Sequence, residues 1–176
     1  MRSLVALGLL SVLGLQSAFA AESDSAGIRF HFGFGTSGEF KRTNNTYVSI
    51  SGPEIGLEIP VTKVGPVNFS FAPSVFLGGR LSHSKDSDGD VYRFIGQGRL
   101  NLPKGSGYAV FGIGYAHSFD RAKQFDAVDG TVAKFGYGIP LRVARLKHYS
   151  PEIEASYYAA SNGQLRGFFV GLSGSL

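Results

Sequence analysis

Three aspartates in one polar stretch have the spacing of ligands for a hard cation. Asp86, Asp88 and Asp90 are each separated by one small residue, so several carboxylate oxygens could converge on one calcium ion. A calcium loop of this type also needs a glutamate at its twelfth position, where this chain has Gln97. We therefore interpret the stretch as a solvated loop tip, with calcium binding by the three aspartates as the alternative.

Nucleophilic or metal chemistry would require histidines beside a hydroxyl, a carboxylate or one another. The histidines are His31, His83, His117 and His148, and they lie on distant segments without the spacing of metal ligands. His117 is followed directly by Ser118, but neighbouring side chains of an extended strand point to opposite faces. The serine then has no base to activate its hydroxyl. We therefore expect neither an enzyme nor a bound cofactor.

The stretch over residues 28–35, Ile-Arg-Phe-His-Phe-Gly-Phe-Gly, indicates which elements position these side chains. Successive side chains of a strand point to opposite faces. Phe30, Phe32 and Phe34 therefore share one face. Arg29 and His31 share the other face with two glycines. The water-facing side of a strand in a soluble sandwich seldom consists of glycines beside a lone arginine. The phenylalanine side of this strand is therefore suited to contact with lipid.

Seven further segments repeat this two-faced pattern. They are residues 47–61, 66–80, 91–102, 108–119, 131–143, 149–160 and 165–176. Each is about as long as a strand that crosses a bilayer at a tilt. In the first of them, Val48 and Ile50 have the opposite parity to the apolar residues that follow, so we expect a β-bulge near Gly52 and Pro53.

The connections between the segments alternate in length. Those after the first, third and fifth segments are long and polar, and they cover residues 37–46, 82–90 and 120–130. Those after the second, fourth and sixth segments are short. This asymmetry is typical of an outer-membrane barrel, which has short turns on the periplasmic side and longer loops outside.

Aromatic residues at the segment ends predict two interfacial girdles. Tyr47, Tyr92 and Phe119 lie where segments meet the long connections, and Tyr108 and Tyr149 lie where segments meet the short ones. Such bands mark the two membrane interfaces of a barrel. For each residue, the ordinary strand propensity of aromatics is the alternative explanation.

The N-terminus predicts export. Arg2 precedes an apolar run from Leu4 to Leu15, and an Ala-x-Ala sequence ends at Ala20. We interpret residues 1–20 as a cleaved signal peptide and residues 21–176 as a single domain, with a membrane anchor as the alternative. No later apolar run approaches the roughly 20 residues of a membrane helix, so any spanning must be done by strands.

Composition agrees with a surface that is not mainly in water. Charged residues are 17% of the chain, against about 25% in a typical soluble domain. The chain has no cysteine, so disulfides do not stabilise it. The net charge of +4 is spread without a basic run, which argues against a nucleic-acid partner.

The chain after residue 20 resembles the small eight-stranded outer-membrane barrels, namely the OmpA-like transmembrane domain and its OmpX-type relatives. Its last segment is similar to their assembly signal, with Phe168, Val170 and Leu172 at alternate positions, although Gly174 and Leu176 replace the usual aromatics. The resemblance implies an all-β, eight-stranded antiparallel up-and-down transmembrane barrel in the bacterial outer membrane. Lipid and lipopolysaccharide would be its partners, with other envelope proteins contacting the long loops. The resemblance indicates no oligomeric state.

A second likeness concerns the lipid A deacylases, which are enzymes on barrels of the same size. Residues 157–162 are similar to the His-x-Ser-Asn strand end of those enzymes. Ala159 occupies the place of the histidine, so Ser161 lacks a base. This departure favours a barrel without hydrolase activity, and a membrane lipid hydrolase is kept as an alternative.

Eleven ionisable residues fall on the small-residue faces and would line the lumen. They are Arg29, His31, Glu54, Glu58, Arg80, Arg93, Arg99, Lys134, Arg142, Glu152 and Glu154. An eight-stranded barrel is only wide enough for side chains to fill. We therefore predict a plug of salt bridges, because buried charges need partners. The expected pairs are Arg142 with Glu152, and Arg29 with Glu54 or Glu58.

Two alternatives to a closed membrane barrel remain. One is a narrow pore that prefers anions, because bases outnumber acids in the predicted lumen. The other is a soluble periplasmic ligand-binding barrel with the phenylalanine face inward. That arrangement would leave many glycines outside, which is a poor solubilising surface.

Overall fold

The computed structural model of the chain describes residues 27–41, 47–79, 89–103, 106–120, 127–141 and 151–175. The expected signal peptide lies outside these ranges, as do Arg80, Arg142, Asp86 and Asp88. Within the same ranges, no helix is long and apolar enough to cross a membrane.

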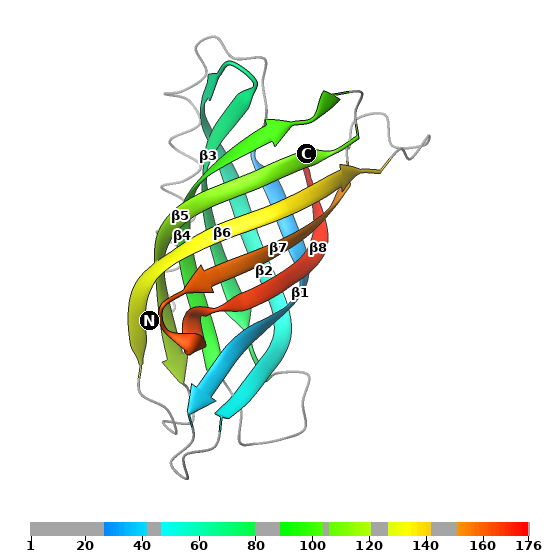
Figure 1. Cartoon of the computed structure of the whole chain (residues 1–176). Helices are drawn as coiled ribbons and strands as arrows, with labels where there is room; N and C mark the ends of the chain where they lie inside the picture. The colour runs from blue at the N-terminus through cyan, green and yellow to red at the C-terminus, as the bar shows by residue number, and fades with distance from the viewer. Residues whose placement is uncertain are drawn as a thin grey trace, which may run out of the picture.

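Eight antiparallel strands close into one barrel, in which each strand pairs with its neighbours in the sequence and β8 pairs with β1 (Figure 1). They are β1 (Arg29–Lys41), β2 (Tyr47–Val64), β3 (Val67–Leu77), β4 (Gly89–Asn101), β5 (Tyr108–Asp120), β6 (Val128–Pro140), β7 (Glu152–Ala160) and β8 (Gly167–Ser175). A short 3-10 helix, η2 (Gly163–Leu165), joins β7 to β8. The all-β up-and-down barrel predicted from the alternating sequence is confirmed.

The two ends of the barrel differ. We call the end with the connections after β1, β3, β5 and β7 the loop end, and the other the turn end. At the loop end β1 extends through Lys41, so the first connection is shorter than predicted. At the turn end the connection after β6 is not short, because β6 ends at Pro140 and β7 begins after Pro151. Proline lacks the amide hydrogen of a ladder bond, which limits pairing at these points.

The β-bulge expected near Gly52 and Pro53 is not present. The ladder between β1 and β2 runs past both residues without a register shift, and the shift lies between Ser37 and Phe40 of β1. Ile50 explains the difference. Its side chain is only 2% exposed and belongs to an apolar core inside the barrel. Because Ile50 faces inward, the side chains of β2 alternate regularly past Gly52 and Pro53, and no bulge is needed there.

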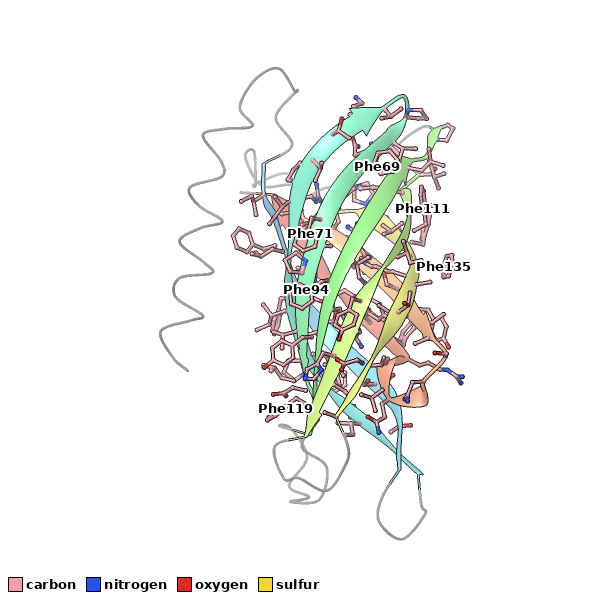
Figure 2. All side chains as sticks on the ribbon, turned by 90° about the vertical axis from the view of Figure 1, so that its left-hand side faces the viewer. Phe69, Phe71, Phe94, Phe111, Phe119 and Phe135 are labelled. Atoms are coloured by element: carbon pink, nitrogen blue, oxygen red, sulfur yellow. The ribbon has the colours of Figure 1, made fainter. Side chains whose placement is uncertain are left out.

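The outer wall of the barrel is apolar along its height. Figure 2 shows labelled phenylalanines of β3 to β6 distributed from Phe69 toward one end to Phe119 near the other. Phe32 of β1 is 60% exposed, and Ile113 of β5 is 65% exposed. The other exposed phenylalanines are Phe30, Phe34, Phe71, Phe94, Phe111, Phe135 and Phe168. The predicted division into an apolar outer face and a mixed inner face is therefore observed.

Glycines on the inner face make room for large side chains. Tyr108 points inward and is buried, whereas the sequence assigned it to an interfacial girdle. A Cβ atom at Gly138 would collide with the Tyr108 ring, and one at Gly56 would collide with the His31 ring. The backbone approaches these rings too closely for any residue but glycine.

Candidate functional site

Nine of the eleven ionisable residues predicted for the lumen lie among the described residues, and they point into the barrel. They are Arg29, Arg93, Arg99, Lys134, Glu54, Glu58, Glu152, Glu154 and His31. Arg80 and Arg142 lie outside the described ranges. The described cations and carboxylates are equal in number, so neighbouring charges inside the barrel can be matched.

The turn end of the lumen holds a cluster around Glu152. Arg99 donates to both carboxylate oxygens of Glu152, one at 2.8 Å. Arg29 donates to the same carboxylate from another strand, and its Nε lies 3.6 Å from a Glu58 oxygen. The Arg99 guanidinium stacks over the Tyr108 ring with its Cζ 3.5 Å from the ring centroid, which adds a cation–π contact.

The middle of the lumen is organised by Glu154. Lys134 Nζ lies 2.8 Å from Glu154 Oε1 and also donates to the Gln97 side chain at 3.1 Å. The hydroxyls of Ser156 and Tyr108 donate to Glu154 at 2.6 and 3.2 Å. The carboxylate therefore has three donors in a space where an unpaired charge would be costly.

Toward the loop end, Glu54 accepts three hydrogen bonds. They come from Arg93 at 3.0 Å, from the Tyr158 hydroxyl at 2.8 Å and from Ser74 at 3.0 Å. Arg93 is fully buried and lies over the Tyr158 ring, with its Cζ 4.1 Å from the ring centroid. Its Nε and one of its Nη atoms have no hydrogen-bond partner among the described residues, so Glu54 carries most of the stabilisation of this charge.

His31 is isolated from the acid–base pairs. Its Nε2 is buried without a hydrogen-bond partner in the described part of the chain, and its ring packs edge-on against Phe169 at 5.7 Å between centroids. Within the described ranges, no group of three potential metal ligands occurs. The other described ionisable residues of the lumen are arranged in ion pairs and hydrogen bonds.

An apolar layer lies inside the barrel toward its loop end, and sequence reasoning missed it. Its members are Ile50, Phe76, Val91, Ile95, Ala116, Val132, Tyr158, Leu165 and Phe169. Leu165 belongs to η2. Two hydroxyl groups hold η2 in place: that of Ser118 donates to Gln164 Oε1 at 3.0 Å, and that of Ser37 donates to the Gln164 backbone carbonyl at 2.6 Å. The sequence signal for this layer was Phe169, a large side chain among the small inward-facing residues of the last strand.

The turn end is more open. A cavity of about 110 Å³ lies there, with room for a few water molecules. It is lined by Arg29, Glu58, Pro60, Asn68, Phe69, Ser70, Arg99 and Asn101. The lumen is thus polar at the turn end, where there is room for water, and contains an apolar layer toward the loop end.

Among the residues singled out for cation or nucleophile chemistry, the structure describes Asp90, His117 and Ser118. Asp90 lies in β4, opposite Phe119, and is buried rather than placed at a loop tip. His117 and Ser118 face opposite ways, as expected, because Ser118 is buried in the lumen and His117 lies on the outer wall. The sequence did not indicate that His117 meets Asp129 across β5 and β6, with Nδ1 2.5 Å from Oδ1.

Closed up-and-down topology, an apolar outer wall and an ion-paired interior together define the fold of the small eight-stranded outer-membrane β-barrels. No family model matches the chain, and no curated protein sequence matches it.

One similar solved structure is Neisserial surface protein A, with 8% sequence identity and a TM-score of 0.51, covering 84% of this chain and 97% of that chain. The N-terminal β-barrel domain of Pseudomonas aeruginosa OprF has 12% identity and a TM-score of 0.42, over 84% and 95% of the two chains. The attachment invasion locus protein Ail of Yersinia pestis has 13% identity and a TM-score of 0.45, over 85% and 97%. The likeness to Neisserial surface protein A, at 8% identity, concerns the fold alone.

Proposed function

We propose that this chain is exported with cleavage of a signal peptide after Ala20, and that it resides as a closed structural barrel in a bacterial outer membrane. The observation that carries the proposal is the wall of exposed aromatic and aliphatic side chains around a closed sheet. In water such a wall would be an aggregation surface. In a bilayer it is the expected lipid contact, and a closed sheet leaves no backbone group unpaired.

Fractionation of expressing cells tests the location. The processed chain should remain with the outer-membrane fraction and require detergent for release. It should also migrate differently in electrophoresis before and after boiling, because a membrane barrel stays folded until heated. Recovery in the soluble periplasm without detergent would refute the proposal and favour a soluble ligand-binding barrel.

The lumen is proposed to be shut rather than conducting. Support comes from the pairing of Glu54, Glu152 and Glu154 with cations across the interior, and from the apolar layer at the loop end. A dry layer in a narrow barrel excludes ions because they cannot shed their hydration there. The proposed role is therefore structural: the barrel occupies the membrane without conducting. The connections at its loop end are contact surfaces for lipopolysaccharide and other envelope proteins.

Planar-bilayer recording of the purified protein tests the closed lumen. The expected trace shows no steady conductance steps at either polarity. Stable, anion-selective steps would overturn the plug and support the narrow pore. The variant Leu165→Ala is recorded beside the wild type for comparison, since it thins the apolar layer without removing a charge.

A further inference from the structure

His31 differs from the other ionisable residues that the sequence placed in the lumen, because each of the others that the structure describes takes part in an ion pair. It lies on β1, opposite Gly56 of β2 and Ser173 of β8. The ordinary pKa of histidine, about 6.5, places its change of charge closer to neutral pH than that of arginine, lysine, glutamate or tyrosine. His31 is therefore the group of this set that is suited to respond to a mildly acidic medium.

The His31 ring lies in a close-fitting seat. A Cβ atom at Gly56 would lie 2.0 Å from Nε2, so the ring lies directly against the β2 backbone. The ring also packs edge-on against Phe169, with 5.7 Å between the ring centroids. Its Nε2 is buried there without a hydrogen-bond partner among the described residues. This seat suits an uncharged ring, because burying an unpaired charge is costly.

Phe169 connects the His31 seat to the apolar layer. It is 1% exposed and is a member of that layer. Its ring lies over the backbone of two glycines, since a Cβ atom at Gly33 or Gly171 would come within 2.6 or 2.4 Å of the ring. In the ladder, Phe169 pairs with Gly35, which lies beyond His31 toward the loop end. The seated His31 ring therefore supports the apolar layer from its turn-end side.

Charged groups face His31 from several strands. They are Glu54 and Glu58 on β2, Lys134 on β6, Glu154 on β7 and Arg29 on the same strand as His31. The neighbours on β8, Phe169 and Ser173, carry no charge. Glu54 and Glu154 already have cations at 3.0 and 2.8 Å. A charged His31 would therefore have to compete with a cation for either of these two carboxylates.

Glu58 is the carboxylate available to a charged His31. Ser70 donates to one of its oxygens at 3.0 Å, whereas Arg29 Nε lies 3.6 Å from the other, beyond hydrogen-bond distance. Glu58 follows Gly56 by two positions on the same face of β2. Such diagonal neighbours across a strand pair are about 7–8 Å apart, within reach of an aromatic side chain. To reach Glu58, the His31 ring must leave its seat.

We propose that His31 is a proton-operated switch, which supports the apolar layer through Phe169 when neutral, and turns to Glu58 and releases that layer when protonated. The charged ring donates from both nitrogens, so it cannot remain where Nε2 has no acceptor. Glu58 lines the cavity at the turn end, where water can hydrate the charged pair. This inference rests on the proposed closed lumen and adds its regulation by mild acid.

Thiol labelling in phospholipid vesicles tests the switch, because the chain has no cysteine of its own. Val132→Cys is the reporter, since Val132 is buried in the apolar layer and cysteine is a smaller apolar residue. The labelling rate by a small water-soluble thiol reagent is divided by the rate for the same reporter in a His31→Asn background. This ratio cancels the pH dependence of the thiol itself.

The ratio should rise on acidification. If His31 takes its proton only after leaving its seat, with the ordinary pKa of about 6.5, the open fraction rises about tenfold between about pH 7.5 and about pH 5.5. The labelling ratio should rise by the same factor. The carboxylates of the lumen remain largely charged over this range, because ordinary glutamates titrate near pH 4.

Two further variants separate the switch from a general effect of acid. His117→Asn is the matched control, because it removes an exposed imidazole of the outer wall, and it should keep the tenfold rise. Glu58→Gln retains the histidine but removes the charge that receives it, so the rise should be largely lost. A ratio that stays constant with pH, or a rise that survives Glu58→Gln, would overturn the proposal.

Folding and closure of the lumen are controlled separately. Each variant should retain the heat-dependent electrophoretic shift, which reports a folded barrel without reference to the switch. If His31→Asn fails to fold, Glu58→Gln takes its place as the reference background. Slow labelling at both pH values would refute the switch alone and leave the closed lumen intact. Fast labelling at both pH values in every background would refute the proposed closed lumen as well.

Discussion

At the scale of single residues, Glu54 is the group on which the buried Arg93 charge depends. Replacing Glu54 with glutamine leaves that guanidinium without a counter-charge in an interior site. Breaking a buried pair by removing one partner typically costs about 3–5 kcal/mol. We expect a loss of this order in the free energy of unfolding, measured by denaturant titration in phospholipid vesicles.

Glu58 supplies the comparison for that measurement. It lies beside the cavity at the turn end, where water can replace a lost contact, and its nearest cation is 3.6 Å away. Glu58→Gln should therefore cost less than Glu54→Gln. Equal costs for the two variants would show that burial of Arg93 does not set the energetics.

A second prediction at this scale concerns the contact of Gly138 with Tyr108. Gly138→Ala should force the buried ring to move, and such overpacking costs about 1–3 kcal/mol. In a Tyr108→Ala background the added methyl group should cost almost nothing, so the two changes should be strongly non-additive. Denaturant titration of the four proteins measures the coupling. Gly96→Ala is the control, since the nearest atom to its Cβ lies 3.8 Å away.

At the scale of elements, η2 contributes Leu165 to the apolar layer inside the barrel. Leu165 is fully buried in the apolar layer, whereas Leu172 of β8 is exposed on the outer wall. Leu165→Ala should destabilise the barrel by about 2–5 kcal/mol through lost contacts and a cavity. Leu172→Ala should cost clearly less, because lipid chains can fill the space. Similar losses in vesicle unfolding would argue against an apolar seal.

The strands themselves were largely predictable, whereas their bounds and connections were less so. Alternation in residues such as Phe30, Phe32 and Phe34 is a local property, and it predicts a strand without knowledge of its neighbours. Pro140 and Pro151 illustrate the limit. Each was counted inside a strand or at its start, whereas in the structure β6 ends at Pro140 and β7 begins directly after Pro151, with one further backbone hydrogen bond from Leu141 N to the Pro151 carbonyl. The consequence is a longer connection at the turn end than the sequence indicates.

At the scale of the whole molecule, the solvent of the outer wall can be tested directly. Ile113 lies at the centre of β5 and is 65% exposed. If a bilayer surrounds it, Ile113→Lys should cost about 2–4 kcal/mol, the value for a cation near the membrane midplane. Val61→Lys, near the turn end of β2, should cost about 0–1 kcal/mol, because the cost of a cation falls toward the membrane interfaces. Unfolding in vesicles measures the free-energy cost of both substitutions. An Ile113→Lys variant as stable as the wild type would indicate that water rather than lipid surrounds the outer wall.

Side-chain alternation depends only on the local chain, so the sequence was enough to predict eight two-faced strands and the inward position of the nine charged or ionisable residues that the structure describes. Which of these charges meet depends on the tertiary structure. Arg99 and Glu152 lie on β4 and β7 and touch across the lumen, which follows from closure and stagger of the whole sheet. The same closure brings Ile50 and Phe169 together in one apolar layer. Strand neighbours can thus be anticipated from sequence, but contacts across a closed interior require the complete barrel.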